Sequence, residues 1–198
     1  MHLRVAQVVP RTEAEGPGQR FAVWVQGCTL RCVGCCNPEM FPREGGERVA
    51  VRELARRVAR TVGIEGISLL GGEPFEQAEA CARFARLVGA AGLSVTVFTG
   101  YTRAELDARR GAAGVADLLS ACDLLVDGRF DSDRSDASRR WVGSSNQVVH
   151  FLTPRYSASD PRFFATNTAE IRLSRGELTM NGWPGLVPEL LRKARRLG

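Results

Sequence analysis

The cysteines of this chain are unevenly placed, and four of the six lie within nine positions, at Cys28, Cys32, Cys35 and Cys36. They directly follow FAVWVQ, residues 21–26, an apolar stretch that predicts a strand. Thiols crowded at a strand end could form a disulfide, a zinc site, a redox pair or an iron–sulfur site. A chain of 198 residues can bury a sizeable core without cross-links, so a metal or redox site is favoured over disulfides.

The rest of the composition narrows the protein class. No stretch approaches the roughly 20 apolar residues that a membrane-spanning helix needs, and the N-terminal residues lack the apolar core of a secretory signal. We therefore expect a cytoplasmic protein that does not bind membranes. The formal net charge is +5, but the arginines are interspersed with acidic residues, which argues against dedicated nucleic-acid binding.

Apolar segments alternate with amphipathic ones along most of the chain. From Val51 to Val62, apolar side chains recur at helical spacing, and FEQAEACARFARLVGAAG predicts a second helix. This alternation is typical of α/β proteins with a parallel sheet, whose ligands bind at the carboxyl ends of the strands. Glycine or polar residues do follow the expected strands, which lie at residues 3–9, 21–26, 64–70, 93–98 and 123–130.

The pattern changes after residue 130. Residues 131–140 predict a polar loop, and WVGSSNQVVHF, residues 141–151, predicts a further strand. EIRLS and ELTMN, separated by Arg-Gly, predict a hairpin, and LVPELLRKARRL predicts a terminal helix. We therefore expect a core domain over residues 1–151 and a small appendage over residues 152–198, with a possible role in docking a partner.

The spacing of the clustered cysteines favours one kind of site. Structural zinc usually takes four ligands arranged as two pairs, and here Cys28, Cys32 and Cys35 have no second pair. Cys36 is adjacent to Cys35, and neighbouring residues rarely turn both side chains onto one ion. Three thiolates suit a [4Fe–4S] cluster with one iron left open for a substrate, although zinc stays an alternative. Cys81 and Cys122 are interpreted as small core residues.

CTLRCVGC resembles the CxxxCxxC signature of the radical S-adenosylmethionine (SAM) enzymes, and GGEP at residues 71–74 resembles their second motif. The chain resembles more closely the activating proteins of anaerobic ribonucleotide reductase, a branch of the glycyl-radical-enzyme activases. The similarity runs from about residue 3 to residue 151. Its segments, in order, are EGPGQR, WVQGCTLRCVGCCNP, ISLLGGEPF, VFTGYTRAEL, LLVDGRF and WVGSSNQVVH.

This resemblance implies a fold and a reaction. The fold would be an incomplete parallel (β/α) barrel followed by the small appendage. One [4Fe–4S] cluster on Cys28, Cys32 and Cys35 would support reductive cleavage of SAM to methionine and a 5′-deoxyadenosyl radical. That radical would take a hydrogen atom from a glycine of a partner, anaerobic ribonucleotide reductase. A flavodoxin or ferredoxin-type protein would donate the electron.

The resemblance also implies which residues bind SAM. The main chain of Gly34, Cys35 and Cys36 would lie beside the adenine. Glycines 71 and 72 have no side chain to block a close approach, so GGEP would present main-chain groups to the methionyl end, with Glu73 adding charge near its ammonium. The other expected residues follow later strands, and with GGEP the set is Gly71, Gly72, Glu73, Pro74, Thr99, Gly100, Asp127, Arg129 and Asn146.

Two features depart from the resemblance: the residues beyond 151, and a cysteine directly after the third expected ligand. They keep two alternatives open. One is radical SAM modification of a peptide or small molecule, with the appendage as its recognition module. The other is a non-enzymatic iron–sulfur or zinc-binding interaction module.

Overall fold

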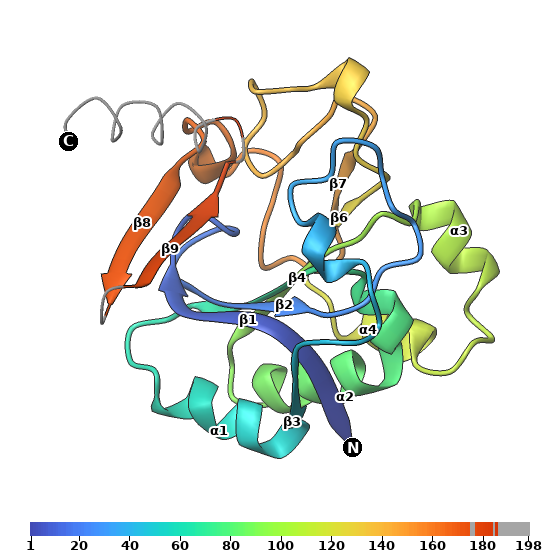
Figure 1. Cartoon of the computed structure of the whole chain (residues 1–198), viewed down its shortest axis with the longest axis vertical. Coiled ribbons are helices and arrows are strands. Elements are labelled where there is room, and N and C mark those ends of the chain that lie inside the picture. The colour runs from blue at the N-terminus through green and yellow to red at the C-terminus, as the bar shows by residue number, and fades with distance from the viewer. Residues whose placement is uncertain (175–176, 184, 186–198) are drawn as a thin grey trace.

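A computed structural model describes residues 1–174, 177–183 and 185 of the chain (Figure 1). Its main feature is a seven-stranded sheet in the order β3-β1-β2-β4-β5-β6-β7. The central strands β2, β4, β5 and β6 are parallel, and antiparallel strands flank them on both sides. The expected α/β architecture is confirmed at this level. The strands are β1 (His2–Thr12), β2 (Arg20–Val25), β3 (Glu47–Ala50), β4 (Gly66–Gly71), β5 (Ser94–Phe98), β6 (Leu124–Asp127) and β7 (Val148–Phe151).

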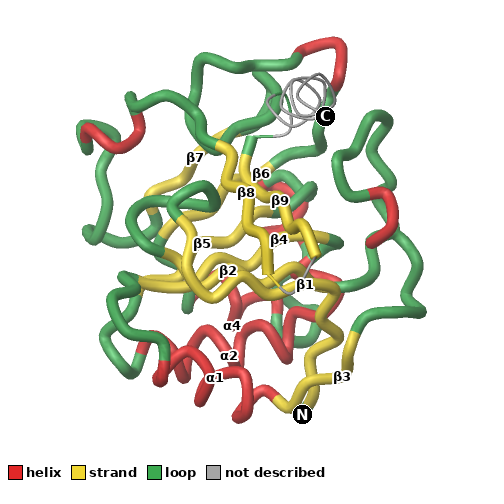
Figure 2. The backbone as a smooth tube through the Cα atoms, turned by 60° about the vertical axis from the view of Figure 1, so that its left-hand side comes forward, coloured by secondary structure: helices red, strands yellow, loops and turns green. Residues whose placement is uncertain are grey.

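Three of the four α-helices gather on one side of the sheet. Figure 2 shows α1, α2 and α4 together beneath it, with long loops on the other side. Among the described residues, none of the helices has the length and apolar character to span a bilayer. The α-helices are α1 (Val51–Arg60), α2 (Ala78–Gly89), α3 (Arg103–Ala108) and α4 (Val115–Ser120), and single 3-10 turns are η1 (Pro38–Met40), η2 (Pro74–Gln77), η3 (Ser132–Arg134) and η4 (Pro161–Phe163).

Alternation along β2 divides the core into two layers. Phe21 and Val23 belong to the large cluster that packs against Phe84 of α2, and all three side chains are almost fully buried. Burying each such side chain contributes about 1.5–3 kcal/mol. Trp24 points to the other side, where it joins a smaller cluster with Leu70. The loop-covered face of the sheet is therefore apolar near the carboxyl ends of its central strands.

Two expected strands are shorter than the sequence predicts. Residues 123–130 form a strand only up to Asp127, since Gly128 has a φ of 102° and turns the chain. Residues 141–151 form a strand only from Val148. The preceding residues form a turn, because the side-chain oxygen of Gln147 accepts hydrogen bonds from the backbone N–H groups of Gly143 and Ser144. Strand β3 was not expected.

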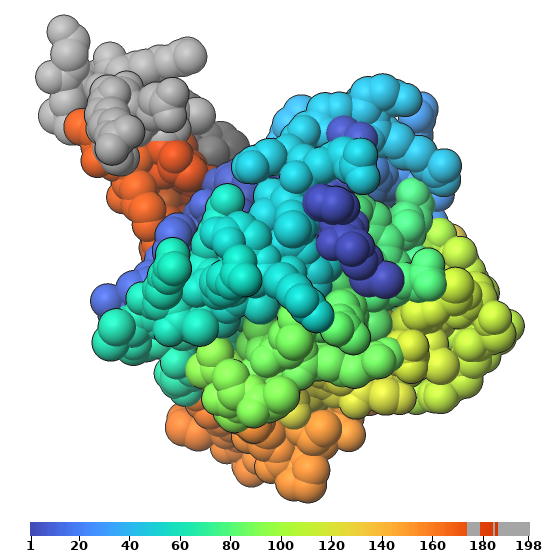
Figure 3. Space-filling view, turned by 90° about the horizontal axis from the view of Figure 1, so that it is seen from below, coloured from blue at the N-terminus to red at the C-terminus, as the bar shows by residue number. Residues whose placement is uncertain are grey.

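Strands β8 (Ala169–Ser174) and β9 (Glu177–Gly182) form a separate antiparallel pair, at the positions where the sequence predicts a hairpin. In the view of Figure 3 this hairpin, in orange, projects beside the body of the molecule. The terminal helix expected in LVPELLRKARRL lies outside the described residues.

The buried carboxyl of Glu15 should make stability depend on pH. Burial raises its pKa from 4.5 to about 7. Between these values the unfolded carboxyl is ionised while the folded one is protonated, so the free energy of unfolding should fall as pH rises from about 4.5 to about 7, by about 3 kcal/mol. Glu73, whose pKa burial also raises to about 7, adds to the fall in the same pH range, whereas carboxylates with lowered pKa values, such as Glu105 and Asp136, affect stability only at lower pH.

Glu15→Gln tests this pH dependence. The glutamine keeps the oxygen that accepts hydrogen bonds from Asn181 and Gly182, but it cannot ionise. Its urea midpoint should change less than that of the wild type between about pH 4.5 and about pH 8. Equal changes in the two proteins would show that Glu15 does not cause the dependence.

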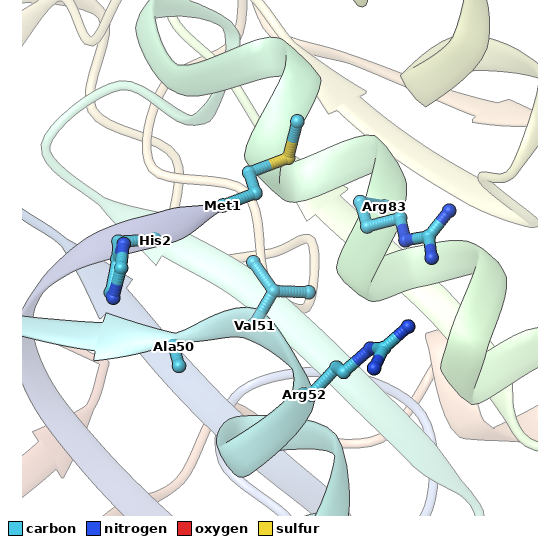
Figure 4. A pocket seen from close by; sticks show the side chains of 6 residues that line it. All are labelled: Met1, His2, Ala50, Val51, Arg52 and Arg83. Atoms are coloured by element: carbon cyan, nitrogen blue, oxygen red, sulfur yellow. The ribbon is translucent and has the colours of Figure 1, made fainter.

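A surface pocket of about 470 Å³ lies where the start of β1 meets the β3–α1 junction and α2 (Figure 4). None of the residues expected from the sequence to bind a cofactor lines it. The pocket is lined by Met1, His2, Ala50, Val51, Arg52 and Arg83.

Candidate functional site

The cysteines lie on a loop that leaves the sheet at the carboxyl end of β2 and folds back on itself. The backbone N–H of Gly27 donates to the carbonyl of Met40 over 2.9 Å, and that of Cys28 donates to the carbonyl of Phe41 over 3.0 Å. The side chain of Gln26 donates to the carbonyls of Glu39 and Pro42. These bonds close residues 26–42 into a compact loop, called here the cysteine loop.

Each of the three cysteines with motif spacing meets backbone N–H groups. Those of Leu30 and Arg31 point to the sulfur of Cys28, and that of Phe130 points to Cys32. The N–H of Asn37 lies 3.5 Å from Sγ of Cys35. All six cysteines of the chain are free; Cys28 is buried, Cys32 and Cys35 are half-buried, and Cys36 is exposed. Backbone donors favour the thiolate over the thiol. The thiolate is the form that binds metals.

The four thiols differ in acidity. Burial raises the pKa values of Cys28 and Cys32 above 9. The pKa of Cys35 is lowered to about 6, chiefly by a hydrogen bond from Cys36 and also by the N–H of Asn37. That same bond raises the pKa of Cys36. Cys35 is therefore a thiolate at neutral pH, whereas Cys28 and Cys32 would release protons on binding a metal.

The donor set fits an iron–sulfur cluster. Among the described residues, no three histidine, cysteine or acidic side chains converge on a position for a single metal ion. Zinc needs its ligands within about 2.0–2.3 Å of one ion, whereas the cysteines of a four-iron cluster each bind a different iron. The free thiols on this compact loop are soft sulfur donors of the kind that such clusters use.

The GGEP segment lies directly against the start of the cysteine loop. The N–H of Gly72 donates to the carbonyl of Val25, and that of Glu73 donates to the carbonyl of Gly27, each over 2.8 Å. A Cβ at residue 72 would lie 2.4 Å from the carbonyl oxygen of Gly27, so only glycine fits there. Gly71 has a φ of 92°, and Pro74 begins η2. The glycines are required for this close approach of two backbones.

The side chain of Glu73 links the ends of β4 and β5. It is buried and accepts hydrogen bonds from Thr99 Oγ1 at 2.8 Å, from the N–H of Gly100 at 2.9 Å and from the N–H of Phe75 at 2.9 Å. Burial raises its pKa to about 7, and the three donors oppose that shift. Both carboxylate oxygens accept hydrogen bonds from the protein itself, so Glu73 holds Thr99, Gly100 and Phe75 in position. Its contact with the methionyl ammonium stays a prediction.

The turn after β5 also meets the cysteine loop. A Cβ on Gly100 would lie 2.5 Å from Cδ1 of Leu30, two residues after Cys28. The N–H of Thr29 donates over 2.7 Å to Glu76 in η2. Leu30 and Glu76 were not expected from the sequence, because Leu30 is one of the unspecified positions of the CxxxCxxC signature and Glu76 follows GGEP.

The end of β6 and the residues after it bring further charged side chains to the carboxyl ends of the parallel strands. Asp127 is buried, accepts a hydrogen bond from the N–H of Arg103 and lies 2.9 Å from Nε2 of His150. His150 was not among the residues expected at the site, and only the antiparallel pairing of β6 with β7 reveals this contact. Arg129 forms an ion pair with Glu105 at 2.9 Å, both of them partly exposed.

Asn146 lies over this segment and has an unused acceptor. Its Nδ2 donates to the carbonyl of Arg129 over 2.8 Å. Its Oδ1 is buried and has no hydrogen-bond partner within the described residues. Such an atom is costly unless another donor meets it, as a bound ligand could. The chain after β6 also contacts the cysteine loop, because a Cβ on Gly34 would lie 3.4 Å from the side chain of Ser132.

The chain is similar to several known proteins. Residues 14–150 match the family described as 4Fe-4S single cluster domain. Similar curated relatives are named anaerobic ribonucleoside-triphosphate reductase-activating protein. The one from Vibrio cholerae is 32% identical over 155 residues, covering 74% of this chain and 97% of the relative. Those from Salmonella typhimurium and Escherichia coli K12 are both 34% identical, covering 76% and 74% of this chain and 99% and 97% of the relatives.

Among solved structures, the crystal structure of QueE from Escherichia coli matches with a TM-score of 0.46 and 14% identity. The match covers 62% of this chain and 68% of that one.

Proposed function

The chain belongs to the family of the anaerobic ribonucleoside-triphosphate reductase-activating proteins, and from this we infer that it is a radical SAM enzyme that generates a glycyl radical on such a reductase. The observation that carries the chemistry is the contact of the cysteine loop with GGEP, where Glu73 N–H donates to the carbonyl of Gly27. It brings the three thiols with motif spacing next to Gly71 and Gly72, which have no side chains to block a ligand.

The cysteine loop would hold one [4Fe–4S] cluster through Cys28, Cys32 and Cys35. When bound, the cluster supplies the electron that splits SAM into methionine and a 5′-deoxyadenosyl radical. The chain keeps each of these thiols next to backbone N–H groups, which stabilise negative charge on sulfur. Cys36 is exposed and pairs with Cys35, so it acts as a neighbour rather than a ligand.

The surrounding residues would orient SAM. The main chain of Gly34, Cys35 and Cys36 would lie by the adenine, and that of Gly71, Gly72 and Pro74 by the methionyl group. Glu73 fixes Thr99 and Gly100 at the neighbouring strand end. Asn146 offers the unpaired acceptor Oδ1, and Asp127 and Arg129 bring opposite charges to the same edge.

The apolar face of the sheet would shield the reaction from water. Trp24 and Leu70 are the next-to-last residues of β2 and β4, and both pack with Met40 of the cysteine loop. A dry wall at the carboxyl ends of the strands protects a reactive carbon radical from side reactions. The chain thus supplies orientation and exclusion of solvent.

The finer architecture is part of the same proposal. The four parallel strands would form the incomplete barrel of a core domain over residues 1–151, with residues 152–198 as an appendage. A flavodoxin or ferredoxin-type protein would supply the electron. The hydrogen donor would be a glycine of the reductase's main chain.

Anaerobic reconstitution with the reductase tests this function. Protein loaded with about four irons per chain, given SAM and dithionite, should form 5′-deoxyadenosine and a glycyl radical seen by electron paramagnetic resonance on the reductase. Exposure to oxygen should then cleave the reductase chain at that glycine. Deoxyadenosine without a radical on the reductase would favour modification of another peptide or a small molecule. Zinc with four sulfur ligands, by X-ray absorption, would favour a non-enzymatic module.

A further inference from the structure

The β8–β9 hairpin docks on the segment that follows β1 through polar contacts. The guanidinium of Arg172 donates to the carbonyl of Arg11 over 2.6 Å, and the N–H of Glu13 donates to Glu170 over 2.8 Å. Ile171 and Leu173, which alternate with these residues along β8, are 49% and 74% exposed. The docked face is therefore the polar one, and its hydrogen bonds fix one orientation of the hairpin.

Asn181 of β9 is the centre of this contact. Its side chain is buried, and Nδ2 donates to Thr12 Oγ1 at 2.9 Å and to Glu15 Oε1 at 3.2 Å. Its Oδ1 accepts a hydrogen bond from Arg172. The N–H of Gly182 donates to the same oxygen of Glu15 over 2.6 Å. Two adjacent residues of the hairpin thus hold one buried carboxyl group.

Glu15 begins a segment that lies on the loop-covered face of the main sheet. Residues 14–17 are all buried. The carbonyl of Glu15 accepts a hydrogen bond from Ser68 Oγ in the middle of β4, and the carbonyl of Pro17 accepts one from Arg20. A Cβ on Gly16 would lie 3.0 Å from Ser68 Oγ. Ser68 pairs with Ala22 of β2, and Ala22 belongs to the cluster that includes Met40 of the cysteine loop, so this segment and the cysteine loop cover the same face of the sheet.

The hairpin lies beyond the part of the chain that its relatives share. The family match ends at residue 150, and the curated relatives are covered over 97–99% of their length by about three quarters of this chain. Residues 14–17 are inside the matched range, whereas Asn181 is outside it. An element added to this chain therefore fixes a segment within the shared range.

We propose that the β8–β9 hairpin positions the site wall formed by residues 14–17, with Asn181 as the positioning residue that acts through Glu15. This inference rests on the proposed function. In productive turnover the hydrogen atom leaves the partner's glycine Cα and ends on C5′ of 5′-deoxyadenosine, so each deoxyadenosine formed matches one glycyl radical. A wall that shifts by about 1 Å weakens this transfer strongly, because reacting groups must be held close.

Asn181→Ala in the full-length, cluster-loaded protein tests the proposal, with the reductase, SAM and dithionite present. We expect iron content close to the wild type, and glycyl radical formation lowered about tenfold. The ratio of deoxyadenosine to glycyl radical should rise, because SAM cleavage continues while transfer to the partner fails. Leu173→Ser, on the exposed face of the hairpin, is the matched control and should keep the wild-type ratio.

A double-mutant cycle separates positioning from general loss of stability. If Asn181 acts through Glu15, Asn181→Ala combined with Glu15→Ala should raise the ratio no further than the stronger single variant. Additive effects would overturn the proposal, as would a wild-type ratio in Asn181→Ala. If Asn181→Ala loses its cluster, Arg172→Met replaces it in the test. This variant removes the donors to Asn181 and Arg11, and it should likewise raise the ratio of deoxyadenosine to glycyl radical.

The two proposals fail in different ways. Wild-type protein that forms no deoxyadenosine from SAM would overturn the proposed function and this inference with it. Wild-type protein that forms the glycyl radical, beside variants that match it in ratio and rate, would overturn the role of the hairpin alone.

Discussion

Cys32→Ser should remove the iron–sulfur cluster and lower SAM cleavage more than about 100-fold. Removing a residue that only hydrogen-bonds to a metal ligand already lowers metal affinity or activity about 10–100-fold. Removing a ligand itself should lower them further. Serine oxygen is a harder donor than thiolate and does not replace it on such a cluster. The measurements are iron per chain after anaerobic reconstitution, absorbance of the cluster and deoxyadenosine formed with dithionite.

Cys36→Ser is the matched control for this ligand assignment. Cys36 is exposed, adjacent to Cys35 and equally free, but it stands outside the motif spacing. We expect the variant to keep about four irons and to cleave SAM. Loss of iron as complete as in Cys32→Ser would make Cys36 a ligand and the three-cysteine assignment wrong.

Gly72→Ala should also be severe, although it changes no reactive group. Its Cβ would lie 2.4 Å from the carbonyl oxygen of Gly27 and 2.8 Å from that of Val25. Both contacts are with backbone, which cannot move aside like a flexible side chain. We expect a loss of about 1–3 kcal/mol in the free energy of unfolding, and SAM cleavage about 100-fold slower as GGEP shifts from the cysteine loop.

Gly89→Ala is the control that shows whether the loss in Gly72→Ala comes from the crowding at residue 72 rather than from any glycine-to-alanine change. Gly89 ends α2, and a Cβ there meets nothing within 4 Å. The change should be neutral or stabilise the protein by up to about 1 kcal/mol, because alanine favours the helix. Urea unfolding and deoxyadenosine assays on both variants measure the contrast. If Gly72→Ala cleaves SAM as fast as the wild type, the assignment of GGEP to the site is wrong.

The parts of the fold and site that follow local rules could be predicted from the sequence. The central strands show as short apolar runs, and the segments that meet at their carboxyl ends show as glycine or polar residues directly after them. The parallel arrangement then brings GGEP, Gly100 and Phe130 to the cysteine loop. Strand β3, with the polar sequence ERVA, has no such apolar signal.

The contacts that sequence reasoning missed join residues far apart in the chain. Asn181 bonds to Glu15 across 166 positions, and no periodicity links them. The hydrogen bond from Thr99 to Glu73 joins the ends of β4 and β5, and no local pattern in the sequence pairs these two side chains. His150 meets Asp127 only because β7 reverses direction beside β6.

The open sheet has a consequence for self-association. In the part of the chain that the structure describes, β3 and β7 each pair on one side only. Their free backbone groups could recruit a strand from another molecule, which is how edge-to-edge aggregates begin. Each of these edge strands is only four residues long, and charged Glu47 and Arg48 occupy half of β3. The sheet can thus stay unclosed while offering other chains too short a template for ordered growth.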